Sequence, residues 1–515
     1  MFKMKRIWAV LLTACMFLTF APVQAFASTT NGKCGDNVSY SFDLDTGHLN
    51  INGKGAIRSY TYSNNAPWYS FSDNIVSVNI EPGVTGIGDY AFFWCDKITS
   101  VTISNSVKSI GLSAFENCKA LTSVNIPDGV ESIGIGAFEN CEALTSVNIS
   151  GSVKSIGKSA FSGCYISKED AEDGIEKGLE KVTIQDGVES IDTFAFSGCK
   201  KLTDVTLPDS VTSIGDNAFQ NTGLYDLYNH TGWEVCYIGS HLIAANQSIS
   251  GTCTVKRRTK TIAGRAFDSC SDLESIIIPD SVVSIGNHAF FSCSSLKSIT
   301  IPKNVTSIGD EVFYNCFDLE SINVDSDNTA YSSESGVLYN KDKTEIIRFP
   351  KEKPNTSFVI PNSVTSIANG TFENCRKLKN ISIPNGVESI GNHAFLTCEA
   401  LTSITIPDGV PCIGEKTFYG CKSMTSVTIP NSVLIIEDGA FENCLKSIKV
   451  NYIGSEDEWN EVIGAGKSIL SSTNINYLSG ISVAYSDDGK IAVEPINTEK
   501  GKTVIFALYN GDKFV

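Results

Sequence analysis

The sequence predicts a repeat solenoid that is mostly β, with a parallel sheet along one face and small β caps at its ends. The 515 residues exceed what one ordinary hydrophobic core accommodates. The 42 glycines and a charged fraction of only 19% favour short strands and many turns over long helices. Cysteines recur at intervals of 23 residues within unbroken blocks, and a fixed period of this length is typical of a solenoid.

Two columns of residues define the repeat. Twelve of the 17 cysteines share one frame: Cys95, Cys118, Cys141, Cys164, Cys199, Cys270, Cys293, Cys316, Cys375, Cys398, Cys421 and Cys444. A phenylalanine stands three residues before each of them, and one further phenylalanine keeps the frame although Thr222 replaces its cysteine: Phe92, Phe115, Phe138, Phe161, Phe196, Phe219, Phe267, Phe290, Phe313, Phe372, Phe395, Phe418 and Phe441. The two columns therefore predict thirteen repeats.

Each repeat is expected to contribute one half-buried strand followed by a turn. Val124 and Ile126 alternate with polar neighbours, which is the pattern of a strand with one buried face. Pro127 follows directly and ends the strand, because proline cannot donate to a sheet ladder. Phe138 and Cys141 then close the coil, so that stacked repeats bury a continuous stripe.

The twelve repeat cysteines are expected to be small core residues and not a disulfide framework. Side chains in register on neighbouring turns point the same way, which keeps their Cβ atoms further apart than the roughly 3.8 Å that a disulfide prefers. Burial also suppresses the reactive thiolate. We therefore predict that these cysteines stay reduced.

Interruptions of the repeat and the patterns that flank it divide the chain into five parts. These are a signal peptide over residues 1–27, an N-terminal β cap over 28–75, the repeat array over 76–450, a C-terminal cap over 451–479, and the truncated start of a β-rich, β-sandwich-like domain over 480–515. Insertions into the array are expected near 165–178, 223–262 and 325–358. The first is expected to be an acidic loop or short helix, the second a divergent repeat, and the third a strand and hairpin.

The N-terminus has the pattern of a secretory signal peptide. Basic residues precede an apolar run from Ile7 to Phe20, and Ala25-Phe26-Ala27 is a small-x-small site, so cleavage is expected after Ala27. An alternative interpretation takes residues 12–15 as a lipoprotein box in which Cys15 becomes lipidated. The rest of the chain contains no stretch long and apolar enough to span a bilayer. We expect a secreted or cell-surface protein.

The repeat consensus is Ile-Pro-x-x-Val-x-Ser-Ile-Gly-x-x-Ala-Phe-x-x-Cys, as in residues 126–141. Together with Gly336-Val-Leu-Tyr-Asn-Lys-Asp342 and the opening Cys34-Gly-Asp, this consensus resembles the BspA-like class of bacterial leucine-rich repeats. The resemblance covers roughly residues 34 to 478. It implies a leucine-rich-repeat array and a surface or secreted protein that takes part in adhesion to host or matrix proteins and to other cells.

The charge of the chain argues against nucleic acid as a partner. The formal net charge is −17, whereas nucleic-acid affinity comes largely from clustered Lys and Arg. The one basic cluster is short and is expected to be a solvated turn or strand face: Lys256, Arg257, Arg258 and Lys260.

The residues that could carry catalysis or hold a cofactor do not form a recognisable motif. His288 and His393 occupy one repeat column whose other members vary widely, which predicts an exposed column, and the repeat cysteines are expected to be core residues. Residues 464–468 end like a phosphate-binding loop, but Glu461 stands where the first glycine is required. We therefore predict no catalytic centre, no cofactor and no metal.

The open face of the predicted sheet is the candidate binding surface. The polar position between the two inward-facing residues of each strand is occupied by hydroxyls and amides: Thr102, Asn125, Asn148, Thr183, Thr206, Thr300, Asn323, Ser382, Thr405 and Thr428. Such a surface suits a glycan or a peptide backbone. The alternative is structural, because Thr favours exposed strands and stacked Asn residues form ladders.

The predicted function is adhesion or binding by a monomer that takes an extracellular protein or glycan ligand. Two other functions stay open. The chain could be a structural scaffold that carries a further domain beyond Val515, or the non-catalytic module of a secreted glycan-active enzyme.

Overall fold

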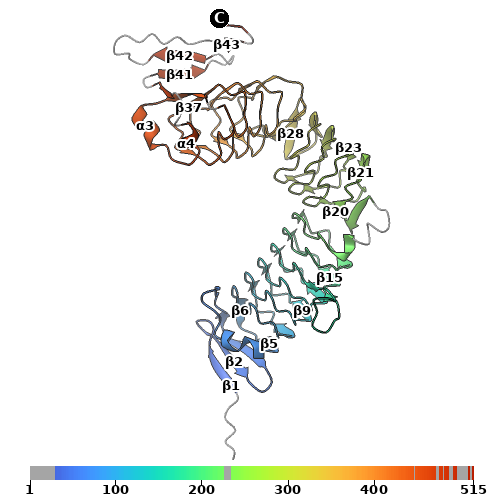
Figure 1. Ribbon diagram of the computed structural model, residues 1–515. Helices are drawn as coiled ribbons and strands as arrows, with labels where there is room; N and C mark the ends of the chain where they lie inside the picture. Colours follow the sequence, from blue (N-terminus) through green and yellow to red (C-terminus); the bar gives the residue numbers. More distant parts are fainter. Residues whose placement is uncertain are drawn as a thin grey trace, which may run out of the picture.

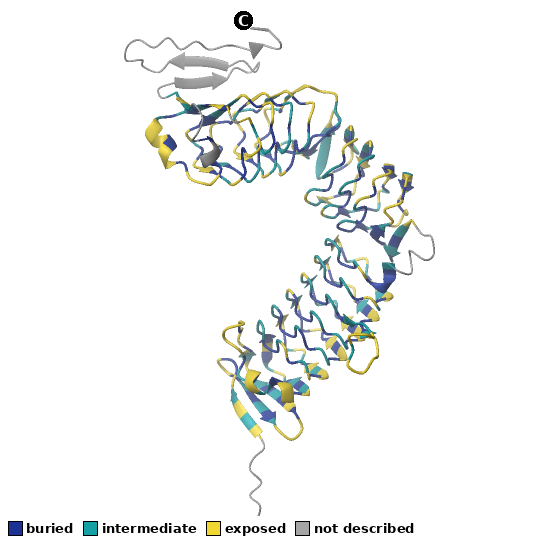
Figure 2. Cartoon of the chain, in the orientation of Figure 1, coloured by how far each residue is buried: buried dark blue, intermediate teal, exposed yellow. Residues whose placement is uncertain are grey.

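A computed structural model describes residues 29–225, 234–445, 447–470, 475–478, 481–485, 491–495, 509–510 and 513–514; the expected signal peptide lies outside this part of the chain. The turns stack into a long curved array that is C-shaped in Figure 1. Figure 2 shows buried residues in the interior of the coil along the described array. The prediction of a solenoid with parallel sheets is confirmed.

Each regular turn contains two strands. In one turn, β9 (Ser123–Ile126) belongs to a first sheet and β10 (Ser132–Ile133) to a second sheet. Both pair in parallel with the equivalent strands of the next turn, so that Val124 lies beside Val147 and Ile133 beside Ile156. The sequence prediction of one strand per turn was wrong, because a strand of two residues is too short to show alternation.

The third side of each turn carries the Phe and Cys columns on a tight backbone turn. Gly136 and Asn140 adopt φ values of 60° and 57°, and the equivalent residues of the other regular turns share this left-handed conformation. Phe138 N donates to Ala160 O of the next turn over 2.7 Å. The column of His288 and His393 is the first of these two positions, and both residues are half-buried. The expectation of an exposed column was therefore wrong.

The Phe and Cys columns are the core of the solenoid. Neighbouring rings from Phe92 to Phe219 stack 4.9 to 5.3 Å apart, and Trp68 of the cap stacks on Phe92 at 5.1 Å. Cys141 Sγ donates to the carbonyl oxygen of Phe115 in the preceding turn over 3.3 Å, and this contact recurs along the column. Thiols are free at every cysteine that the structure describes. That the repeat cysteines stay reduced remains a prediction.

The first segment of the array joins the N-terminal hairpins to regular turns. Its first sheet contains β1 (Thr29–Lys33), β2 (Val38–Asp43), β3 (His48–Gly53), β5 (Ser77–Ile80), β7 (Ser100–Ile103), β9, β11 (Ser146–Ile149), β15 (Lys181–Ile184) and β17 (Asp204–Thr206). Its second sheet contains β4 (Gly55–Ala56), β6 (Val84–Ile87), β8 (Ser109–Ile110), β10, β12 (Ser155–Ile156), β16 (Ser190–Ile191) and β18 (Ser213–Ile214). A 3₁₀ segment, η1 (Tyr69–Asn74), precedes β5, and β13 (Tyr165–Ile166) pairs with β14 (Lys177–Gly178) around a loop.

The middle segment begins with a hairpin, β19 (Val235–Ile238) and β20 (His241–Ala245). The hairpin extends a second sheet made of β22 (Thr261–Ile262), β24 (Ser284–Ile285) and β26 (Ser307–Ile308). The first sheet of this segment contains β21 (Gly251–Thr254), β23 (Leu273–Ile277), β25 (Ser298–Ile301) and β27 (Ser321–Val324).

The last segment also begins with a hairpin that extends the second sheet. Its strands are β28 (Tyr331–Glu334), β29 (Val337–Asn340), β30 (Glu345–Arg348), β32 (Ser366–Ile367) and β34 (Ser389–Ile390), followed by β36 (Cys412–Ile413) and β38 (Ile435–Ile436). The first sheet continues as β31 (Ser357–Val359) with β33 (Asn380–Ser382), then β35 (Ser403–Thr405), β37 (Ser426–Pro430), β39 (Lys449–Ile453) and β40 (Ile475–Tyr477). Two clusters of buried residues meet at this hairpin, where Leu338 belongs to one and Tyr339 to the other.

A short helix closes the described end of the array. The helix α3 (Glu456–Glu461) has a capping box between Ser455 and Glu458, and its Trp459 packs on Tyr452 at 5.0 Å. In α4 (Lys467–Leu470), Lys467 Nζ donates to Trp459 O and Val462 O at the C-terminal end of α3. The lysine of the rejected phosphate-loop pattern therefore caps a helix. Beyond it, β41 (Ile481–Tyr485) pairs with β42 (Ile491–Pro495), and β43 (Tyr509–Asn510) with β44 (Lys513–Phe514).

Candidate binding surfaces

The ten sequence-predicted binding residues lie on the open face of the first sheet. All are exposed or half-exposed. Register places Asn125, Asn148, Thr183 and Thr206 in one row, and it pairs Thr300 with Asn323 and Thr405 with Thr428. Thr102 lies beside Asn79, and Ser382 lies beside Val359. These residues are divided among four separate sheets, so the predicted surface is a series of short rows.

The amides on this face bond partly to one another. Asn148 Nδ2 donates to Asn125 Oδ1 over 3.3 Å, and Asn79 Nδ2 donates to Asn50 Oδ1 over 2.8 Å. Strands β5, β9 and β15 follow the outer side of the curve in Figure 1. The ladder interpretation therefore accounts for these asparagines, and the sheet face presents a convex surface.

A group of aromatic side chains at the N-terminal end was missed by the sequence reasoning. We call Tyr62, Tyr90, Phe93 and Trp94 the aromatic cluster. The rings of Tyr62 and Phe93 lie 4.9 Å apart, Tyr62 and Tyr90 5.1 Å, and Tyr90 and Phe93 5.5 Å. Tyr62 is 68% exposed and Trp94 50% exposed. Clustered aromatic exposure of this kind marks an interaction surface more often than scattered exposed residues do.

Local structure explains how these rings meet. Tyr62 lies in a turn closed by hydrogen bonds between Thr61 and Asn64. Tyr90 and Trp94 occupy the two left-handed positions of the first regular turn, with φ of 54° and 58°. The ammonium group of Lys119 lies 5.9 Å from the centre of the Trp94 ring.

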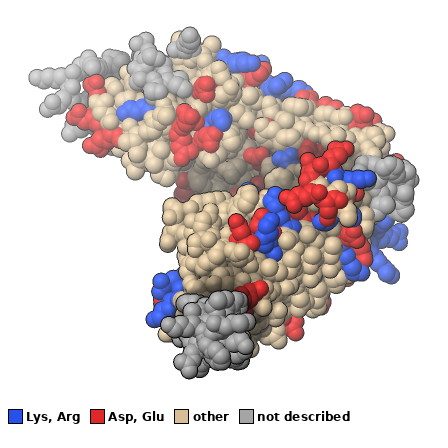
Figure 3. Space-filling model, turned by 60° about the horizontal axis from the view of Figure 1, so that its bottom comes forward, with Lys and Arg blue, Asp and Glu red and all other residues tan. Residues whose placement is uncertain are grey.

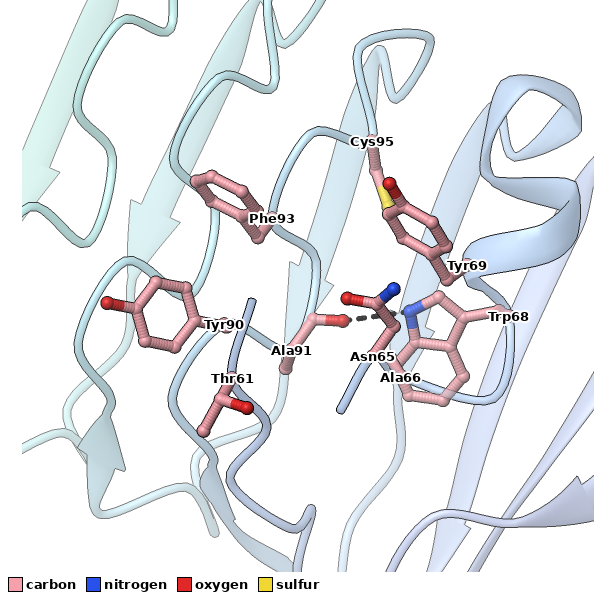
Figure 4. A pocket seen from close by; sticks show the side chains of 9 residues that line it. All are labelled: Thr61, Asn65, Ala66, Trp68, Tyr69, Tyr90, Ala91, Phe93 and Cys95. Atoms are coloured by element: carbon pink, nitrogen blue, oxygen red, sulfur yellow. Dashed lines mark hydrogen bonds between the residues drawn. The ribbon is translucent and has the colours of Figure 1, made fainter. Parts of the chain in front are cut away.

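The cavity beneath the cluster is too small for a ligand. It measures about 10 Å³, which is room for roughly one water molecule, and Figure 4 shows Tyr90, Phe93 and Tyr69 around it. The Trp68 indole donates to Ala91 O over 2.8 Å and closes the floor. The cluster can therefore act only as a surface on which a ligand lies.

Charged side chains do not form one basic area in the view of Figure 3, where acidic and basic groups are mixed. Many pair between neighbouring turns, as Lys181 does with Asp204 at 2.7 Å and Lys297 with Glu274 at 2.7 Å. Within the described ranges, no group of three or more His, Cys, Asp or Glu residues could hold a metal ion. No helix in that part of the chain is long and apolar enough to cross a membrane.

The two-strand turn, the stacked Phe column and the parallel sheets define the class of protein as a leucine-rich-repeat solenoid. The family model described as BspA type leucine-rich repeat region (6 copies) matches residues 64–177, 175–253, 260–355 and 348–462. The chain belongs to this BspA-type family. Families of this kind consist of repeat proteins that are generally not enzymes.

Solved structures of bacterial leucine-rich-repeat proteins resemble the chain. A leucine-rich cell surface protein from Faecalibacterium prausnitzii is 26% identical, with 84% of this chain and 97% of that chain covered and a TM-score of 0.38. A leucine-rich-repeat protein from Eubacterium ventriosum is 22% identical, with 81% and 95% covered and a TM-score of 0.36. The pneumococcal vaccine antigen PcpA is 16% identical, with 86% and 98% covered and a TM-score of 0.32. No curated protein sequence matches the chain.

Proposed function

We propose that the chain is exported and works outside the cell as a binding protein that takes an extracellular protein or glycan ligand. The aromatic cluster carries this proposal, because four rings gather at one end of the solenoid and two of them, Tyr62 and Trp94, expose half or more of their surface. Tyrosine and tryptophan present large rigid surfaces with a polar edge, which is why they are enriched in binding interfaces. The BspA-type family and the predicted signal peptide support an extracellular location.

The binding test compares the full exported chain with a double variant, Tyr62→Ser with Trp94→Ser, on immobilised matrix proteins, a glycan array and cultured cells. We expect the double variant to lose at least tenfold in affinity for the ligand that the wild-type chain selects. The matched control is Ile175→Ser, which removes a comparably exposed side chain, 60% exposed, from the loop between β13 and β14, away from both candidate surfaces. Unchanged binding by the double variant would contradict a role for the aromatic cluster.

A separate variant tests the sheet face. Asn148→Lys with Thr183→Lys places two long charged side chains in the row of β11 and β15 without touching the core. If this variant alone loses binding, the ligand lies on the sheet face and the aromatic cluster does not bind it. Export is tested by N-terminal sequencing of the secreted chain, which is expected to begin at residue 28.

A further inference from the structure

The hairpin of β19 and β20 leaves a gap in the Phe column. Ala245 N donates to Ala266 O over 2.6 Å, which is the bond that Phe138 N makes to Ala160 O in a regular turn. Ala245 therefore occupies a phenylalanine position and supplies no ring. It is half-buried, whereas the phenylalanines on either side, Phe219 and Phe267, are fully buried.

A cleft of about 290 Å³ opens at this gap. The flanking turns touch at the second sheet, where Gly264 N donates to Ile214 O over 2.8 Å, and they separate on the third side around the end of β20. One wall comes from Asn217 and Gln220 in the preceding turn. Other lining residues come from the following turn and from the hairpin itself. The volume is at the lower end of the range of roughly 300–1,000 Å³ for small-molecule sites.

The lining is rich in carboxamides that have free hydrogen-bonding groups. Asn217, Gln220, Asn246 and Gln247 all border the cleft, and the aromatic ring of Tyr225 lies beside them. Across the part of the chain that is described, the side-chain amides of Asn217 and Gln220 form no hydrogen bond. An amide offers a donor and an acceptor side by side, which matches the neighbouring hydroxyls of a sugar ring.

The charges in the wall are already compensated. Arg265 Nη1 lies 3.1 Å from Asp268 Oδ2, and Arg265 Nε lies 3.5 Å from Asp216 Oδ2. Asp216 Oδ2 also accepts a hydrogen bond from His288 Nδ1 over 2.7 Å. Because two carboxylates hold the guanidinium, the described lining residues of the cleft offer no free cation for a phosphate, a sulfate or an acidic sugar.

We infer that this cleft binds one neutral saccharide unit, held by the carboxamides and stacked against Tyr225. The inference rests on the proposed binding function and assigns it a second contact, distant from the aromatic cluster. Ala245 is the residue that makes the cleft, because its small side chain leaves the space that a phenylalanine ring fills elsewhere in the column.

The test is saturation-transfer NMR and calorimetric titration of the full chain with the methyl glycosides of glucose, galactose, mannose and N-acetylglucosamine, and with inorganic phosphate. We expect one or more glycosides to bind with an affinity on the order of millimolar and phosphate not to bind. Asn217→Ala with Gln220→Ala is expected to weaken glycoside binding at least tenfold. Ala245→Phe is expected to abolish it by restoring the ring of the consensus repeat.

The control is Asn105→Ala, which removes an exposed amide in a turn without a cleft and should leave glycoside binding unchanged. If Ala245→Phe does not fold, the double amide variant decides the question. The inference is overturned if no glycoside binds, if phosphate binds in their place, or if both cleft variants bind like wild type. The cleft variants could bind glycosides like wild type while Tyr62→Ser with Trp94→Ser still loses its macromolecular ligand. That result would reject the cleft as a saccharide site and leave the proposed function intact.

Discussion

The two hairpins that interrupt the solenoid enter the repeat at the same place and close it differently. Phe349 N donates to Thr371 O over 2.9 Å, just as Ala245 N donates to Ala266 O over 2.6 Å, so Phe349 and Ala245 are equivalent positions. Phe349 packs against Phe372 with the ring centres 5.4 Å apart and the planes tilted by 36°, and it is fully buried. At the first hairpin the column has a gap, and at the second hairpin the column is filled.

The side chains around Phe349 and Ala245 also differ, because those around Phe349 are larger and charged. At the second hairpin Arg348 and Lys351 stand where the first has Ala244 and Gln247, and Glu373 corresponds to Asp268. Arg348 Nη2 lies 3.1 Å from Glu373 Oε2, and Arg348, Lys351 and Glu373 are all almost fully buried. The same kind of backbone insertion can therefore leave either an open polar cleft or a buried ion-pair cluster of Arg348, Lys351 and Glu373, depending on four side chains.

The largest effect is expected from Phe349→Ala, which makes the second hairpin resemble the first. The loss of a buried ring should cost about 3–5 kcal/mol of local stability. Contacts in a solenoid are between nearest neighbours, so adjacent turns should fray while distant turns stay folded. Hydrogen exchange resolved by segment is the measurement, with Phe138→Ala as the matched loss in a regular turn. Equal loss of protection along the whole array would show that the turns do not unfold independently.

The acidic residues of the two hairpin regions should differ nearly as much. Glu373→Gln leaves Arg348 and Lys351 buried without a counter-ion and is expected to cost about 3 kcal/mol. Asp268→Asn removes a partly exposed ion pair with Arg265 and should cost only about 0–1 kcal/mol. Thermal unfolding of both variants under identical conditions checks the difference. Similar losses of stability would mean that the buried ion-pair cluster depends on its charges no more than the cleft wall does.

The two regions should also respond to pH in opposite directions. The hydrogen bonds that His288 donates to Asp216 and then to Glu311 raise the pKa of His288 to about 9, so its stabilising contribution is complete below about 6.5 and is lost as the pH rises through 9. Burial and then the charge of Arg348 lower the pKa of Lys351 to about 8, so stability is gained as the pH rises from 8 to 10.5. Each contribution is expected to be on the order of 1–3 kcal/mol.

The pH measurement compares unfolding of wild type with His288→Gln and with Lys351→Met between pH 6 and pH 10.5. The first variant should lose the fall in stability that belongs to His288, and the second should lose the rise that belongs to Lys351. Parallel pH profiles for wild type and both variants would contradict these assignments. Subtracting profiles removes the titration of groups elsewhere in the chain.

The period of the sequence was sufficient to predict the solenoid, because spacing alone locates Phe138, Cys141 and their equivalents. The period could not predict the cleft, because Ala245 lies in an interruption of the repeat. Only its hydrogen bond to Ala266 shows that it occupies a phenylalanine position. The aromatic cluster left a weak signal. Trp94 stands in a column that elsewhere holds only small or polar residues. Phe93 gives no such signal, because its column also holds Phe291, Tyr314 and Tyr419. Tyr62 lies outside the repeat and joins these rings only in the folded chain.

The smallest expected effect comes from a regular turn and provides the baseline for both hairpins. Lys108, Glu131, Lys154 and Glu189 alternate in charge along one column, and Lys108 pairs with Glu131 at 3.1 Å while Lys154 pairs with Glu189 at 3.0 Å. Both pairs are exposed, so Glu131→Lys should cost about 0.5–1 kcal/mol through repulsion between stacked cations. The matched control is Glu388→Lys in the same column, where the neighbours are the uncharged Thr365 and Pro411. The control should change stability by less than about 0.5 kcal/mol, because a surface residue without a charged partner contributes little. Denaturant unfolding of both variants decides the matter: equal losses would mean that alternation of charge does not favour the register of the turns.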